Sequence, residues 1–202
     1  MYKQSGEQLL QEKYNTQKRA AAFYQNQMLS SLNEMMQEFI TGQEMMFIST
    51  SDSKGRCDSS FRAGEKGFVR IINDRTVMYP EYRGNGVMAS MGNIMENPQV
   101  GLMFIDFFES QIGLHVNGTA YICENKELDT LRLSKELKED IEAKEGKKAE
   151  RWIVIEVEEA FIHCSKHVPS LQKKHVDQST TKAKGDFFKV KQTKQEIAVK
   201  HK

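Results

Sequence analysis

The chain has 202 residues, of which 39% are hydrophobic and 28% are charged, so it can bury one core and does not have the composition of a disordered protein. Its three cysteines, Cys57, Cys123 and Cys164, argue against a disulfide framework and favour a reducing, cytoplasmic compartment. No run of about eighteen apolar residues occurs, and no basic start precedes an apolar run, so we expect neither a membrane span nor a secretion signal.

The first 41 residues have a helical pattern. Residues 6–41 contain no proline, and their apolar residues recur at helical spacing. This predicts one long or two consecutive amphipathic helices, ended by Gly42, that cover the body or a partner subunit. We therefore separate an N-terminal helical segment, residues 1–42, from a second region at residues 43–170.

The second region has the short apolar periods and turn residues of strands. The expected strands cover residues 45–50, 57–62, 68–72, 76–80, 100–107, 112–123 and 151–164. About seven strands with few helices between them predict an antiparallel barrel, and not a doubly wound sheet. The expected fold class is mainly β with flanking helices.

Two segments between these strands have a helical pattern. Residues 87–97 carry apolar residues on one helical face, and Pro98 would end that helix. Residues 124–150 are highly charged, and we expect their charges to face solvent.

The C-terminal end is basic, although the formal net charge of the whole chain is only +1. Residues 165–202 contain ten lysines and three acidic residues, a balance of +7, which leaves about −6 for residues 1–164. We expect residues 171–202 to form a basic, partly mobile tail, because they are poor in apolar residues. Lysine-rich tails more often serve solubility than nucleic-acid binding, so we expect no nucleic-acid partner.

A short polar loop precedes the helix expected at residues 87–97. It consists of Arg83, Gly84, Asn85 and Gly86, and Asn85 is a candidate N-cap. Free backbone N–H groups and the positive end of a helix dipole favour a phosphate there, and an arginine can hold two of its oxygens. The same residues could form only a turn, and local spacing leaves both interpretations open.

Other polar and aromatic residues lie near this loop in the sequence. Arg62 ends a strand, and Arg70 interrupts an apolar one, where it faces either a ligand or solvent. Tyr79, Pro80 and Tyr82 precede the loop and could form the wall of an aromatic site or simply pack.

The remaining candidate residues carry weaker signals. His163, Cys164 and His167 have no second ligand cluster, so we expect packing at a strand end and no metal site. His115 lies on the polar face of its strand, where it lines a cleft or is solvated. No catalytic residue can be assigned.

Taken in order, three stretches resemble a known family. They are SFRAGEKGFVRIINDRTVMYPEYRGNGVMASMGNIMENPQVGLMFIDF, HVNGTAYI and AFIHCSKHV. The order resembles the FMN-binding split-barrel proteins related to pyridoxamine 5′-phosphate oxidase, in particular the branch of predicted flavin-nucleotide-binding proteins. The resemblance covers residues 6–170 and is most specific at residues 60–107. It implies a homodimer of antiparallel split β-barrels with FMN bound at the subunit interface.

The resemblance also implies roles for single residues. The flavin phosphate would be bound by Arg62 and the loop at residues 83–85, with Ser90 nearby. The backbone of residues 68–70 would follow the edge of the isoalloxazine ring, and residues 79–80 would lie near its face. The full set of expected cofactor-binding residues is Arg62, Phe68, Val69, Arg70, Tyr79, Pro80, Tyr82, Arg83, Gly84, Asn85 and Ser90.

One departure limits the functional expectation. The oxidase has a serine, arginine and lysine triplet where this chain has Arg83, Gly84 and Asn85, and its substrate-phosphate residues are not identifiable here. We therefore do not expect vitamin B6 oxidation. The resemblance implies a flavin-dependent oxidoreductase acting on an unidentified small molecule. The alternative is a non-catalytic module that binds, stores or senses flavin or haem.

Overall fold

The computed structural model describes residues 5–173, 188 and 190. The chain divides into two compact units, Met1–Ser170 and Leu171–Lys202. Most of the basic tail expected at residues 171–202 lies outside the described residues, and its properties stay a prediction. Within the described part, no helix has the length and apolar character that a membrane span requires.

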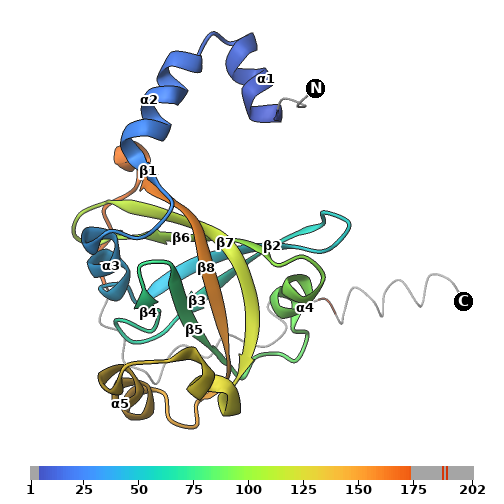
Figure 1. Ribbon diagram of the computed structural model, residues 1–202, viewed down its shortest axis with the longest axis vertical. Coiled ribbons are helices and arrows are strands. Elements are labelled where there is room, and N and C mark those ends of the chain that lie inside the picture. The colour runs from blue at the N-terminus through green and yellow to red at the C-terminus, as the bar shows by residue number, and fades with distance from the viewer. Residues whose placement is uncertain (1–4, 174–187, 189, 191–202) are drawn as a thin grey trace, which may run out of the picture. The chain divides into compact units, whose positions relative to one another are not determined.

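The first unit is an antiparallel sheet with flanking helices (Figure 1). Its strands are β1 (Met28–Leu29), β2 (Met45–Ser51), β3 (Cys57–Ala63), β4 (Arg70–Asn73), β5 (Thr76–Tyr82), β6 (Gln99–Ile105), β7 (Gly113–Glu124) and β8 (Ala149–His163). Its α-helices are α1 (Gly6–Lys13), α2 (Gln17–Gln27), α3 (Glu34–Thr41), α4 (Ala89–Glu96) and α5 (Lys135–Lys144). Two 3₁₀ helices, η1 (Asn125–Leu131) and η2 (Ser165–His167), complete the described elements. The predicted fold class is confirmed.

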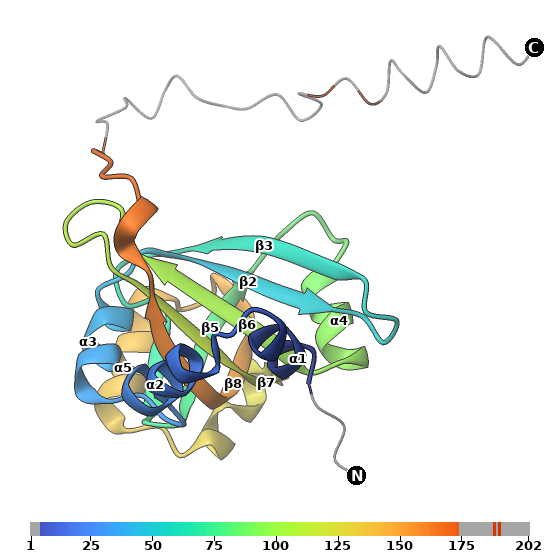
Figure 2. The same cartoon turned by 90° about the horizontal axis from the view of Figure 1, so that it is seen from above.

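The strands follow the order β3-β2-β6-β7-β8-β5-β4, and β1 pairs with β8 outside this path. Every pair is antiparallel, and short connections join β2 to β3, β4 to β5 and β6 to β7. The long strand β8 pairs with β7 along one edge and with β5 and β1 along the other. The sheet is curved, and Figure 2 shows β2 and β3 passing over the other strands.

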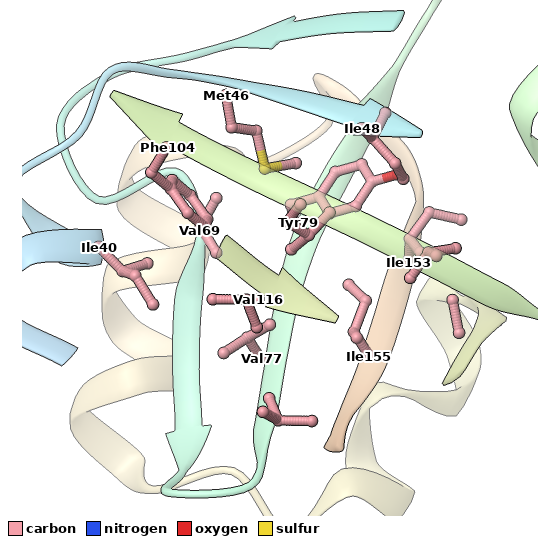
Figure 3. Close-up of a cluster of buried hydrophobic side chains, with 14 of the residues drawn as sticks. Ile40, Met46, Ile48, Val69, Val77, Tyr79, Phe104, Val116, Ile153 and Ile155 are labelled. Carbon is pink, nitrogen blue, oxygen red and sulfur yellow. The ribbon is translucent and has the colours of Figure 1, made fainter. Parts of the chain in front are cut away.

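The main core lies within this curved sheet (Figure 3). In β2 the inward side chains alternate, with Met46 and Ile48 buried, as one-sided burial requires. Strand β5 is buried on both faces from Val77 to Glu81, so its pattern does not alternate. Helix α3 adds the fully buried Ile40 to the same core.

The N-terminal helices differ from the expectation. Three helices and the short strand β1 replace the one or two helices predicted for residues 6–41. Asn15 adopts a left-handed φ of 55° directly after α1, which separates it from α2. Helices α1 and α2 bury no side chain and extend away from the sheet in Figure 1, and α2 touches the sheet through Phe23, which packs against Phe161 of β8. Helix α3 packs on the core, as expected for part of this segment.

Strand β7 faces a bulge of β8 at Gly118, because Glu158 of β8 has no partner between the pairs Asn117–Glu159 and Gly118–Val157. Its register with β8 shifts between Asn117 and Gly118. A Cβ atom at residue 118 would lie 2.0 Å from the carbonyl oxygen of Glu156. Only glycine allows the two backbones to approach this closely.

Candidate functional site

An open cleft of about 790 Å³ lies between β3, the end of β5 and the start of α4. The loop at residues 83–88 forms one of its walls. Six of the predicted cofactor-binding residues line this cleft: Arg62, Tyr82, Arg83, Gly84, Asn85 and Ser90.

The structure places the other five predicted residues away from the lining. Phe68, Val69 and Tyr79 are buried in the main core. Pro80 is buried in β5, opposite Trp152 of β8. These four side chains therefore do not line the cleft, and the place expected for residues 79 and 80 near the flavin ring stays a prediction. The backbone role expected for residues 68–70 stays a prediction.

Arg70 forms a buried ion-pair network. Its Nη2 atom lies 3.0 Å from Glu145 Oε1, and its Nε atom lies 2.8 Å from Asp140 Oδ2. Its Nη1 group also donates to the carbonyl oxygen of Gly67. The interpretation of Arg70 as a residue on an exposed strand face is therefore wrong. The prediction that the charges of residues 124–150 face solvent is wrong for Glu145, which is 4% exposed.

Arg62 and Glu81 form an ion pair at the wall of the cleft. Glu81 Oε1 lies 3.0 Å from Nε and 2.9 Å from Nη2 of Arg62. The carboxylate thus holds the guanidinium at the cleft and offsets its charge.

The Tyr79 hydroxyl is buried, and burial together with the nearby Glu81 charge raises its pKa, so it stays protonated.

A hydroxyl-rich group lies beside this ion pair. Ser60 Oγ donates to Asp58 Oδ2 at 2.9 Å, and Ser90 Oγ lies 3.2 Å from both Asp58 Oδ2 and Ser60 Oγ. We did not predict Asp58 from the sequence. The alternation of residues 58, 60 and 62 in β3 could have identified it, because alternate strand residues share a face.

The loop geometry corrects one expectation. Helix α4 begins at Ala89, and its N-cap is Met88, which has a left-handed φ of 56°. Asn85 is therefore not the N-cap. Its Oδ1 atom accepts a hydrogen bond from the backbone N–H of Val87 at 3.0 Å, which closes a turn inside the loop.

Arg83 is the cation of the cleft that is most available to a ligand. Its side chain is exposed, and no described residue forms an ion pair with it. By contrast, Arg62 is paired with Glu81, and Arg151 lies 3.5 Å from Glu150. Arg83 is thus the cation with which an anion in the cleft would pair, and the cleft also holds the carboxylate of Asp58, which forms no ion pair with a described residue.

The described histidines do not line this cleft. His115 Nε2 is 2.9 Å from His163 Nδ1, and His115 lines a separate cavity of about 290 Å³. Burial and the charge of His163 lower the pKa of His115. In the described part of the chain, no group of three or more His, Cys, Asp and Glu side chains could hold a metal ion.

Several solved structures resemble the chain. A single-residue variant of HupZ from Group A Streptococcus has 20% identity and a TM-score of 0.50, and the match covers 65% of this chain and 99% of HupZ. The heme storage protein HutZ from Vibrio cholerae has 18% identity, coverage of 65% and 94%, and a TM-score of 0.45. An FMN-binding protein from Syntrophomonas wolfei subsp. wolfei has 13% identity, coverage of 75% and 96%, and a TM-score of 0.44.

At these identities the likeness shows the fold alone. A comparison with curated proteins gives no match. The model of the pyridoxamine 5′-phosphate oxidase family, however, matches residues 32–164, which is more than half of the chain. This range contains the whole sheet except β1, together with every residue that lines the cleft. The chain therefore belongs to the family of split-barrel proteins related to pyridoxamine 5′-phosphate oxidase, as the order of its motifs predicted.

Proposed function

We propose that the cleft binds FMN and that the protein is a flavin-dependent oxidoreductase acting on a small molecule. The observation that carries this proposal is the convergence of six predicted residues on one cleft. They come from β3, β5, the loop at residues 83–88 and α4, and so from separate parts of the sequence. The unpaired Arg83 gives this cleft a place for an anion.

The chain's own residues would hold the phosphate end of FMN. Arg83 would supply charge-assisted hydrogen bonds, and Arg62 would add donors that its pairing with Glu81 leaves free. Ala89 and Ser90, the first residues of α4, line the same cleft, and the free backbone N–H groups at the start of a helix can bind an anion. When bound, the flavin supplies the hydride chemistry, and the protein supplies orientation and surroundings.

We also propose a homodimer with the cofactor at the subunit interface. The rim of the cleft carries the exposed apolar side chains of Phe61, Val87 and Met88. Exposed apolar groups beside an open polar cleft are typical of a surface that a second subunit covers. Light scattering should give the mass of a dimer, and a monomer at micromolar concentration would contradict this proposal.

Arg83→Ala is expected to weaken FMN binding about 10- to 100-fold, because a hydrogen bond to a charged group contributes about 1.5–3 kcal/mol. The change removes the one cation of the cleft that no described residue neutralises. Flavin fluorescence quenching measures the affinity. Arg75→Ala is the matched control, since Arg75 lies in an exposed turn away from the cleft. Equal affinities of the two variants would contradict the phosphate site, and no quenching by the native protein would contradict FMN binding.

A non-catalytic module that binds, stores or senses flavin or haem is the second candidate. Among the described residues that line the cleft, none is a His or a Cys, and Asp58, Glu81 and Tyr82 already hydrogen-bond to other residues of the chain. The absorption spectrum distinguishes bound flavin from haem. Oxidation of NAD(P)H by the flavin-loaded protein, faster than by free FMN, would support the oxidoreductase, and no acceleration would support the binding module.

A further inference from the structure

Tyr82 connects the cleft to helix α5, which does not line it. Tyr82 ends β5 and directly precedes the loop at residues 83–88. Its hydroxyl donates to Glu145 Oε2 at 2.7 Å, and Glu145 is the residue that caps the C-terminal end of α5. One hydrogen bond therefore joins the loop wall of the cleft to a residue 63 positions away in the sequence.

The residues around Tyr82 define the position of its hydroxyl. The pairing of β5 with β8 shifts register between Glu81 and Tyr82, where Tyr82 pairs with Ala149 and Glu150 of β8 is left without a partner. Gly64 lies against both Phe68 and Tyr82, because a Cβ atom there would lie 2.5 Å from Phe68 Cβ and 3.2 Å from the Tyr82 hydroxyl. Burial and the hydrogen bond to Glu145 raise the pKa of Tyr82, so its hydroxyl remains a donor at neutral pH.

Glu145 cannot move freely. Its Oε1 atom lies 3.0 Å from Arg70, and both side chains are 4% exposed. Arg70 in turn contacts Asp140 within α5 and the carbonyl oxygen of Gly67. If α5 moved away from the sheet, Glu145 would lose either Arg70 or Tyr82, and a buried charge would remain uncompensated.

We infer that Glu145 is a positioning residue that acts through Tyr82 on the loop at residues 83–88 and couples α5 to the cleft. The part of this inference that concerns FMN rests on the proposed function, whereas the link between loop and helix does not. Coupling between two sites is reciprocal. If α5 stabilises the loop at residues 83–88, a ligand that stabilises the loop must therefore also stabilise α5.

Hydrogen exchange of the full chain, with and without FMN, tests this inference. In the native protein, FMN should protect the loop at residues 83–88 and also the end of α5, including residues 141–146. In Tyr82→Phe, protection of α5 should be lost, and affinity should fall about 2- to 10-fold, as expected for one neutral hydrogen bond. In the free protein, the same variant should raise exchange of the loop several-fold. Tyr121→Phe, on the exposed side of β7, is the control and should behave as the native protein.

Two results would overturn the inference. The first is unchanged loop exchange in free Tyr82→Phe. The second is a uniform rise that includes β2 and β3, which would indicate only a loss of global stability. If the native protein binds no FMN, the proposed function fails, and the comparison of the free proteins still decides whether Glu145 positions the loop.

Discussion

Glu145→Ala is expected to lower the free energy of unfolding by about 3 kcal/mol, because it removes the partner of a buried arginine. Arg70 would keep Asp140, which is half-buried and also pairs with Lys144 at 2.6 Å. Desolvation of the guanidinium would then be compensated only in part. Urea unfolding, followed by circular dichroism, measures the change from the midpoint and slope.

Two further variants test whether the loss in Glu145→Ala comes from the buried ion pair. Glu142→Ala, on the exposed side of α5, should change the unfolding free energy by less than about 0.5 kcal/mol. The double variant Arg70→Met with Glu145→Leu should recover much of the loss, because apolar residues can replace a buried ion pair at little cost. A loss below about 1 kcal/mol in Glu145→Ala would show that Asp140 and Gly67 suffice for Arg70.

Gly118→Ala is expected to destabilise the protein by about 4 kcal/mol, at the upper end of single substitutions. The new Cβ atom would lie 2.0 Å from the carbonyl oxygen of Glu156 and 2.9 Å from its carbonyl carbon. Both are backbone atoms of β8, so no side-chain rotation relieves the clash. Relief requires β7 and β8 to separate at the bulge, in the middle of the sheet. Thermal and urea unfolding measure the loss.

Gly92→Ala is the matched control for this substitution. Gly92 lies within α4, and a Cβ atom there would meet nothing within 4 Å. Alanine should raise the unfolding free energy by about 0.5–1 kcal/mol, because it reduces the freedom of the unfolded chain. If Gly118→Ala matched the stability of the native protein, the strands would accommodate the bulge without the close approach described above.

The strands were predictable because their periodicity reflects burial. Seven of the observed strands overlap the expected ranges, within a few residues at each end. The exception, β1, has only two residues, which is too short to show any period. The break between α1 and α2 at Asn15 was not predicted, because the left-handed conformation of one residue does not change the spacing of the apolar residues around it.

The residues of the cleft were predictable only where they belong to the ordered motifs that resemble the family. The loop at residues 83–85 and Arg62 line one cleft, as expected. Whether Tyr79 faces a cleft or the core could not be deduced, because β5 is buried on both faces. The ion pair of Arg70 could not be predicted either, because its partner Glu145 is 75 residues away in the sequence and only the tertiary structure brings them together.

The place of β8 between β7 and β5 has a consequence for folding during synthesis of the chain. Along the path of the sheet, β5 pairs with β4 on one side and with β8 on the other. A growing chain that has emerged only as far as residue 148 can assemble β2, β3, β6 and β7, but β4 and β5 have no strand through which to join them. Such non-local pairing is slow, and it leaves strand edges exposed meanwhile. The hairpin of β4 and β5, which leads into the loop at residues 83–88, can therefore join the sheet only after β8 has emerged.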